Sequence, residues 1–220
     1  MTGLRRAARR TSRGEEIANS VTPGVGAALA IAGLAVVTSF AAVYGTAWHV
    51  VSCSVYGATL VLLYLASTLY HSIQSPRAKE VLRVLDHSAI FLLIAGTYTP
   101  FTLVNLRGPW GWSLFGVIWG LAVLGIVCRV TVLRRYPWAS AVVGLVMGWV
   151  VVVAARPLLD AMAPGGLLLL LLGGLVYTGG VAFYAWQRLP YHHAIWHGFV
   201  LLGSILHVLA ILLYVVPVLS

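Results

Sequence analysis

Charged side chains are scarce in this sequence. Lys, Arg, Asp and Glu together make up 9% of the 220 residues, whereas 60% of the residues are hydrophobic. A soluble domain of this size could not hide so large an apolar share from water. The scarcity of charge therefore excludes a soluble globular protein and indicates an integral membrane protein, with one helical bundle accounting for nearly all of the chain.

Cysteine is almost absent as well. The two cysteines, Cys53 and Cys128, fall on different predicted helices and lack the spacing of a metal site. We interpret both as ordinary buried small residues, and we expect no disulfide framework.

Acidic residues are the third scarcity: five Asp and Glu stand against 14 Lys and Arg, for a net charge of +9. Such a balance can indicate nucleic-acid binding, but the charges lie in short connections between apolar runs, where they set topology and contact lipid headgroups. We therefore expect no nucleic-acid partner. The basic N-terminal segment is followed by Glu15 and Glu16 rather than by an apolar run, and it lacks a convincing cleavage site. Residues 1–22 are interpreted as a retained cytoplasmic tail.

What the sequence has in abundance is long apolar runs. Seven of them approach or reach the roughly 20 residues that a bilayer core requires. They predict an all-α, seven-transmembrane helix bundle over residues 23–220, in which short connections make sequential helices antiparallel neighbours. The predicted spans are 23–45, 48–71, 86–106, 110–128, 137–155, 165–187 and 193–217.

The basic residues predict the orientation of this bundle. With a cytoplasmic N-terminus, twelve Lys and Arg lie inside and only two outside, which is the bias that membrane proteins show. An odd number of spans then places the C-terminus outside. The inner set is Arg5, Arg6, Arg9, Arg10, Arg13, Arg77, Lys79, Arg83, Arg129, Arg134, Arg135 and Arg188, and the outer set is Arg107 and Arg156.

Five polar residues stand at the inner ends of predicted spans, where ionisable groups are costly and therefore suggest function. Ser67 and His71 are four apart at the end of the second span, and Asp86 opens the third. His193 and His197 are four apart at the start of the seventh, so they share one helix face. The topology brings all five residues to a similar membrane depth.

This set of residues suits a catalytic zinc site. Three imidazoles with one open position are typical of catalytic rather than structural zinc, and the metal lowers the pKa of a bound water. Asp86 could take a proton from that water or orient it, and Ser67 could donate a hydrogen bond. Taken singly, each residue has an ordinary alternative: an interfacial histidine, a serine bonded back to its own helix, or an aspartate that caps the third helix.

The four other histidines are left outside the predicted ligand set. His207 lies roughly 15 Å along the helix from His197, and we interpret it as a polar contact inside the bundle. His49 is expected at the outer interface. His87 and His192 point about 100° away from their candidate neighbours.

Four motifs, in this order along the chain, resemble the hemolysin III family, the bacterial branch of the progestin and adipoQ receptor (PAQR) family. They are Glu15-Glu16-Ile-Ala-Asn19-Ser-Val-Thr, Ser67-x-x-x-His71, Asp86-His87-x-Ala-Ile-Phe with Gly96-Thr-Tyr-Thr-Pro100, and His193-x-x-x-His197. The resemblance runs from about Glu15 to the end of the chain.

The resemblance implies a seven-helix bundle with Zn²⁺ near the cytoplasmic side, bound by His71, His193 and His197. It also links Asp86 to the zinc-bound water, and it relates the chain to membrane metal hydrolases that include alkaline ceramidases. One departure is visible. The family commonly has a histidine after the Asn-x-x-Thr segment, where this chain has Pro23; Thr22 and Pro23 instead suit the cap and first turn of a helix.

The residues thus favour a zinc-dependent hydrolase of the cell membrane that cleaves an amide or ester bond in a lipid, and the resemblance implies a ceramide-like or acyl lipid and a role in membrane-lipid homeostasis. The alternatives are a receptor or sensor with structural zinc, and the cytolysin that the family label suggests. A transporter is disfavoured because no span shows a break in mid-membrane and no inverted repeat is found.

Overall fold

Seven helices in the described part of the chain are long and apolar enough to cross a membrane. The computed structural model describes residues 12–132 and 137–217, and its regular elements there are all helical. The spans are α1 (Arg13–Tyr44), α2 (Ala47–Ser72), α3 (Pro76–Pro100) continued by η1 (Phe101–Asn105), α4 (Pro109–Thr131), the broken helix α5 (Pro137–Gly148), η3 (Trp149–Ala154) and α6 (Ala155–Ala161), α7 (Pro164–Ala185), and α8 (His192–Tyr214). The prediction of an all-α, seven-span bundle is confirmed, and the chain is a multi-pass membrane protein.

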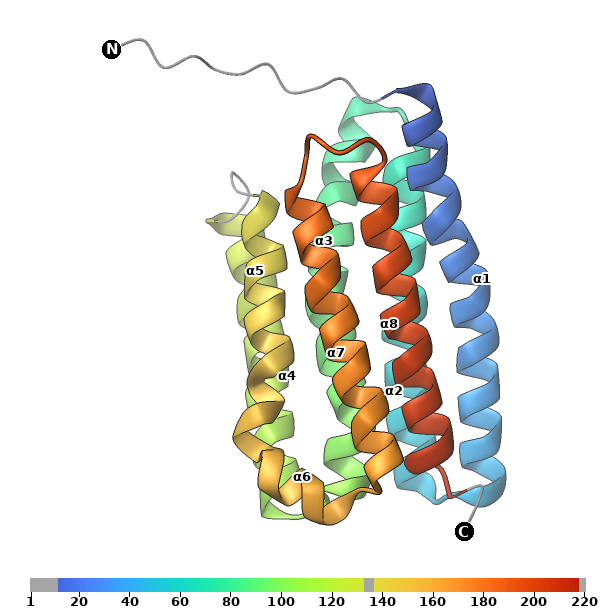
Figure 1. The fold of residues 1–220 in the computed structure, drawn as a ribbon, viewed down its shortest axis with the longest axis vertical. Coiled ribbons are helices and arrows are strands. Elements are labelled where there is room, and N and C mark those ends of the chain that lie inside the picture. The colour runs from blue at the N-terminus through green and yellow to red at the C-terminus, as the bar shows by residue number, and fades with distance from the viewer. Residues whose placement is uncertain (1–11, 133–136, 218–220) are drawn as a thin grey trace.

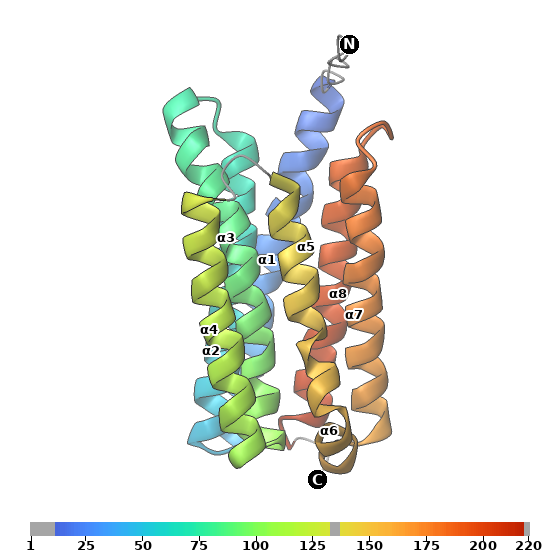
Figure 2. The same ribbon diagram turned by 90° about the vertical axis from the view of Figure 1, so that its left-hand side faces the viewer.

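The helices form an up-and-down bundle in which sequence neighbours pack side by side (Figure 1). In addition, α1 packs against α8, so the first and last spans are neighbours. The upper end in Figure 1 gathers the starts of α1, α3, α5 and α8 and the ends of α2, α4 and α7. We call this the site end. The side view in Figure 2 shows α5 between the α3–α4 side and the α7–α8 side of the bundle.

Helix α1 begins at Arg13, earlier than the predicted start at residue 23. Ser12 caps the helix: its hydroxyl oxygen accepts a 3.2 Å hydrogen bond from the Glu15 amide, and Glu15 Oε2 accepts a 2.7 Å bond from the Ser12 amide. This reciprocal capping box satisfies amides that would otherwise be left free at a helix start. Thr22 and Pro23 lie inside the helix, so the expectation that they form its cap and first turn is wrong. Thr22 instead donates to the Ala18 carbonyl.

Helix α3 also begins earlier than the predicted residue 86. Pro76 occupies its first turn, which suits a residue with a fixed φ and no amide hydrogen. Asp86 therefore lies almost three turns inside the helix and is not its N-cap. The polar turns before Asp86 carry Arg77, Lys79 and Arg83, which is why hydropathy alone missed them.

The described basic residues follow the predicted division between the two ends, although one of them, Arg129, is buried rather than in a connection. Arg107 and Arg156 lie at the end opposite the site end, and the Arg107 guanidinium stacks 4.3 Å from the Trp48 ring. Arg5, Arg6, Arg9, Arg10, Arg134 and Arg135 lie outside the described residues. The direction of the bundle in the membrane remains a prediction.

The fifth span is broken, contrary to the expectation of unbroken spans. Its backbone changes from α-helix to 3₁₀-helix at Trp149 and returns to α-helix at Ala155. At this change of helix type the Tyr98 hydroxyl of α3 bonds to the backbone of the fifth span. This hydroxyl donates to the Gly148 carbonyl at 2.6 Å and accepts from the Val151 amide at 2.8 Å.

Candidate metal centre

Three histidines from two helices meet at the site end of the bundle. His71 stands in the last turn of α2, and His193 and His197 stand in the first two turns of α8. The Nε2 atom of His71 is 3.1 Å from Nε2 of His193 and 3.4 Å from Nε2 of His197. One potential ligand atom from each histidine lies within 4.8 Å of the others. The structure therefore brings together the three predicted ligands, and they are placed to hold a metal ion.

The two nitrogen–nitrogen distances from His71 fit a zinc-sized ion. Zinc binds imidazole nitrogens at about 2.0–2.1 Å, so two nitrogens of a tetrahedral site are roughly 3.3 Å apart. Hydrogen bonds between the imidazoles explain these short distances less well than a shared ion does. His71 Nε2 offers either one proton or one lone pair, yet two imidazole nitrogens approach it. An ion among the three nitrogens satisfies all of them together.

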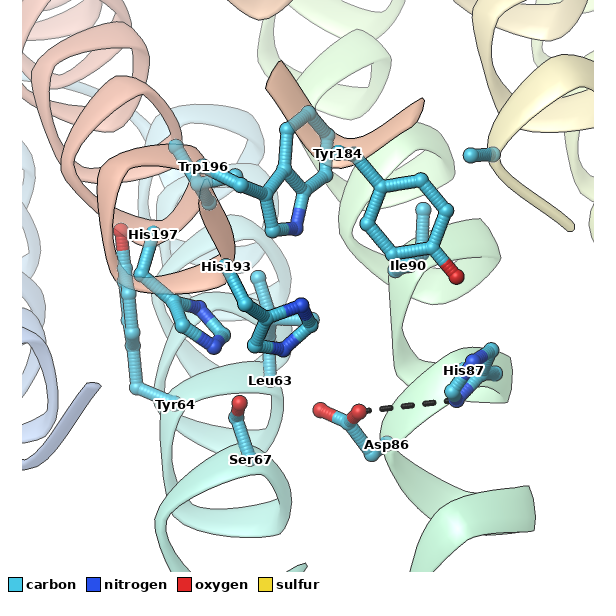
Figure 3. A pocket seen from close by; sticks show the side chains of 12 residues that line it. Leu63, Tyr64, Ser67, Asp86, His87, Ile90, Tyr184, His193, Trp196 and His197 are labelled. Carbon is cyan, nitrogen blue, oxygen red and sulfur yellow. Dashed lines mark ion pairs between the residues drawn. The ribbon is translucent and has the colours of Figure 1, made fainter. Parts of the chain in front are cut away.

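The three histidines complete the group on their own: no carboxylate or thiol from residues 12–132 or 137–217 joins it as a fourth ligand. His193 and His197 instead face a pocket of about 40 Å³ between α2, α3, α5, α7 and α8 (Figure 3). We call it the polar pocket because Ser67 and Asp86 line it, although apolar side chains make up most of its wall. One water needs roughly 10–15 Å³ of such space, so the pocket has room for water or for a reacting group beside an ion. Three ligands with an open side are the arrangement of a catalytic rather than a structural metal site.

Asp86 and Ser67 line this pocket opposite the histidines. Figure 3 shows the Asp86 carboxylate and the Ser67 hydroxyl facing the space below the His193 ring. Both side chains are buried, with 9% and 2% of their surface exposed. Ser67 does not bond back to its own helix, unlike its neighbour Thr68, whose hydroxyl donates to the Tyr64 carbonyl. The Ser67 hydroxyl instead faces the Asp86 carboxylate, with which it interacts.

Two further polar side chains in the pocket were not among the predicted site residues. His87 lies beside Asp86, with its Nδ1 atom 3.5 Å from Asp86 Oδ2, and Tyr184 of α7 stands across the pocket (Figure 3). His87 stands outside the three-histidine group, yet it lines the pocket, although we expected it to point away from its candidate neighbour. The pocket covers a helix face wide enough to include positions 86, 87 and 90 together. The adjacency of His87 to Asp86 was a usable signal, whereas nothing in the sequence marks Tyr184.

Arg129 is the exception among the basic residues. It was expected in a connection beside lipid headgroups, yet α4 continues to Thr131 and the Arg129 side chain is fully buried. Its guanidinium lies within electrostatic reach of Asp86 and Tyr184. A buried cation near a carboxylate offsets part of the cost of keeping that carboxylate out of water. Arg129 therefore belongs to the surroundings of the site.

A second, apolar cavity of about 400 Å³ adjoins the polar pocket. It extends away from the histidines between α3, the broken fifth span, α7 and α8, and its walls are almost entirely aliphatic and aromatic. Its volume is within the range of small-molecule sites. Five residues line both spaces and join them: Leu63, Ile90, Ala141, Trp196 and Val200.

Comparison with known proteins agrees with this architecture. The sequence matches the family described as haemolysin-III related over residues 11–208. It is 48% identical to Hemolysin-3 of Bacillus cereus over 206 residues, which cover 94% of each chain. The chain belongs to the haemolysin-III-related family.

Other relatives of this haemolysin-III-related chain extend the comparison. It is 47% identical to the Hemolysin-3 homolog of Bacillus subtilis (strain 168) over 204 residues, which cover 93% of this chain and 96% of that protein. It is 28% identical to the human Monocyte to macrophage differentiation factor over 175 residues, which cover 76% of this chain and 71% of that one. The family predicted from the motifs is confirmed.

Two other histidines of this haemolysin-III-related chain, His49 and His207, lie away from the three-histidine group, whereas the ring of His192 is 6.1 Å from that of His193. His207 is buried deeper in α8, where its Nδ1 atom is 2.8 Å from the Gly203 carbonyl oxygen and its ring stacks on Tyr177. His49 lies at the opposite end of the bundle and completes the cap of α2, its Nδ1 atom accepting from the Thr46 amide. These positions agree with the interpretation of both residues as contacts outside the ligand set.

Proposed function

We propose that this protein is a zinc-dependent hydrolase of the cell membrane that cleaves an amide or ester bond of a lipid, with its site end facing the cytoplasm. One observation carries the proposal. The three-histidine group opens onto a pocket that contains Asp86 and Ser67, and this pocket adjoins an apolar cavity. These neighbours support the proposal, because the proposed metal ligands, the proposed proton acceptor and a space that could take an acyl chain adjoin one another.

His71, His193 and His197 are the proposed zinc ligands through their Nε2 atoms. Imidazole is a preferred zinc ligand, and zinc bound there would supply a Lewis acid that polarises a carbonyl and acidifies water. Zinc is also suitable because it is not oxidised or reduced, and hydrolysis requires no electron transfer. The open side of the site is the side that substrate and water can reach.

Asp86 and Ser67 have separate proposed roles in the reaction. Asp86 accepts the proton that water loses as the water oxygen bonds to the lipid carbonyl carbon. It returns this proton to the amine nitrogen or alcohol oxygen that leaves when the C–N or C–O bond breaks. The products are a free fatty acid and the deacylated lipid. Ser67 donates a hydrogen bond that holds the water or the carboxylate in place.

The proposed substrate class follows from the apolar cavity. Its aliphatic and aromatic walls exclude charged or strongly polar groups, and they match a single acyl chain. A chain lying in the cavity would bring its carbonyl to the junction with the polar pocket, next to the histidines. Ceramide-like amides and acyl esters meet this requirement.

The test compares wild type, His193→Ala, Asp86→Asn and the control His49→Ala, all purified in detergent. Wild type and His49→Ala should each hold about one zinc per chain, and His193→Ala should lose it. On a panel of ceramides and phospholipids, Asp86→Asn should keep zinc but release fatty acid about 10²–10⁴-fold more slowly, the usual contribution of a general acid–base group. Metal-free wild type, or equal release by wild type and Asp86→Asn, would contradict the proposal.

The same measurements separate the alternatives. A sensor with structural zinc would keep its metal and show no release in either protein. Lysis of red cells is the property that the names of the Bacillus relatives suggest for those proteins. For this chain a cytolysin is disfavoured, because its seven apolar spans require constitutive membrane insertion.

A further inference from the structure

Glu15 is a buried carboxylate that the proposed reaction does not use. Only 2% of its surface is exposed, although it lies in the first turn of α1, where glutamates are usually solvated. The next residue, Glu16, is exposed. A carboxylate is costly to bury unless hydrogen bonds replace its water, so the partners of Glu15 indicate what holds it there.

The two carboxylate oxygens of Glu15 serve different helices. Oε2 accepts the Ser12 amide and completes the capping box of α1. Oε1 accepts a 2.8 Å hydrogen bond from the amide of Tyr191, which is 176 positions away and immediately precedes α8. A cap alone would need only the first of these bonds. The second joins the start of the first span to the start of the last.

Tyr191 is the residue at which the chain turns into α8. Its φ of 58° and ψ of 14° place it in the left-handed region, and it is the only non-glycine residue with positive φ in the described ranges. This conformation is unfavourable for a tyrosine and persists where surrounding contacts impose it. The Tyr191 carbonyl accepts the Ile195 amide at 2.9 Å, so Glu15 and the first turn of α8 fix this residue from both sides.

The fixed conformation of Tyr191 affects the candidate metal centre, because His193 follows Tyr191 by two positions. The rotation of the first turn of α8 sets the direction of His193 and, one turn later, of His197. Absence of a side chain at Gly14 leaves room for the Tyr191 hydroxyl, since a Cβ there would lie 2.8 Å from it. The first turn of α1 is thus shaped to receive this residue.

We propose that Glu15 is a positioning residue: its hydrogen bond to the Tyr191 amide fixes the first turn of α8 and thereby holds His193 and His197 in metal-binding geometry. The metal-binding part of this inference rests on the proposed function. It assigns a role to the Glu15 motif, which the hydrolytic mechanism leaves unexplained. It also makes α1 part of the site, although α1 contributes no ligand.

The test uses four full-length variants of the protein in lipid nanodiscs. Glu15→Ala removes both bonds, whereas Glu15→Gln keeps an oxygen that can accept the Tyr191 amide. Ser12→Ala weakens the cap of α1 but leaves the Tyr191 contact intact. Glu16→Ala is the matched control for loss of a neighbouring, exposed carboxylate. The readouts are hydrogen exchange of residues 188–195 in metal-free protein, Co²⁺ affinity by chelator competition, and the visible spectrum of bound Co²⁺.

Glu15→Ala should raise exchange at the start of α8 and weaken Co²⁺ binding about 10-fold or more, as loss of a group that orients metal ligands does. Its Co²⁺ spectrum should change. Glu15→Gln should recover most of the affinity and the spectrum, and Ser12→Ala and Glu16→Ala should match wild type. The inference is overturned if Glu15→Ala matches wild type in exchange and affinity, or if Ser12→Ala reproduces its effects. If wild type binds no metal, the proposed function fails, whereas the exchange comparison still decides whether Glu15 fixes the start of α8.

Discussion

Tyr98 of α3 and Gly148 of the fifth span are joined by a 2.6 Å hydrogen bond from the tyrosine hydroxyl to the glycine carbonyl. The same hydroxyl accepts the Val151 amide, so one side chain bridges the point at which the fifth span changes from α-helix to 3₁₀-helix. Both backbone groups lie at membrane depth, where water cannot replace a missing partner. This bridge holds one wall of the apolar cavity in its broken form.

Tyr98→Phe should destabilise the protein by about 1–3 kcal/mol, because it removes the hydroxyl that bonds to the Gly148 carbonyl and the Val151 amide within a membrane span. The measurement is thermal unfolding of purified protein in detergent. Tyr44→Phe, which removes a hydroxyl from a half-exposed tyrosine at the end of α1, is the control and should leave the midpoint unchanged. Equal midpoints for the two variants would show that the bridge is dispensable.

Ala141→Phe should separate metal binding from lipid hydrolysis. Ala141 is buried and lines both the polar pocket and the apolar cavity, so a phenyl group there obstructs the junction between them. Misplacing a reacting group by about 1 Å can cost about 10²-fold in rate, so we expect the release of long-chain fatty acid to fall by about that factor. Zinc content should not change.

The control for this variant is Val142→Phe, which adds similar bulk at the next position, where the side chain is 45% exposed on the outside of the bundle. It should hydrolyse long chains like wild type. A fall in rate that is the same for both variants would remove the apolar cavity from the proposed mechanism.

Ser67→Ala should keep its zinc but release fatty acid more slowly. A hydrogen bond to a charged group contributes about 1.5–3 kcal/mol, so we expect fatty acid release to fall about 10- to 100-fold. Thr68→Ala removes the neighbouring hydroxyl, which is bonded to its own helix, and should behave as wild type. Loss of zinc in Ser67→Ala would assign the serine to the structure of the metal centre instead.

The basic residues predict that the site end faces the cytoplasm. Alkaline phosphatase fused after Ser220 should therefore be active, and green fluorescent protein fused at the same position should be dark. Moving the reporters to the N-terminus should reverse both results. A fluorescent C-terminal fusion would place the metal centre on the outer side of the membrane.

The seven spans were predictable because a bilayer imposes a minimum apolar length on every crossing. Their starts were harder to predict. Helices α1 and α3 both begin in polar turns, which a hydropathy profile does not assign to a span. The reciprocal hydrogen bonds of Ser12 and Glu15 that start α1 are likewise not visible in such a profile. Hydropathy registers where a helix enters the hydrocarbon, whereas a helix can begin well before that point.

The histidine group was predictable for a different reason. His193 and His197 share a helix face by their spacing alone, and the charge pattern put His71 at the same depth. The rotation of each helix about its own axis, which decides which side chains face the neighbouring helices, cannot be read from spacing or charge. For that reason the burial of Arg129 beside Asp86, and the approach of Tyr184 from α7, could be found only in three dimensions. The apolar cavity could likewise be found only in three dimensions, because the same apolar residues can pack loosely or tightly and the sequence does not distinguish the two.

The apolar cavity lies between membrane-spanning helices of the bundle. A substrate held there would not need to leave the bilayer, and its encounters with the protein would occur by diffusion in two dimensions. The quantity that governs turnover would then be the mole fraction of substrate among the surrounding lipids. Diluting the substrate with inert lipid would slow the reaction, whereas adding more membrane of the same composition would leave the rate per protein unchanged.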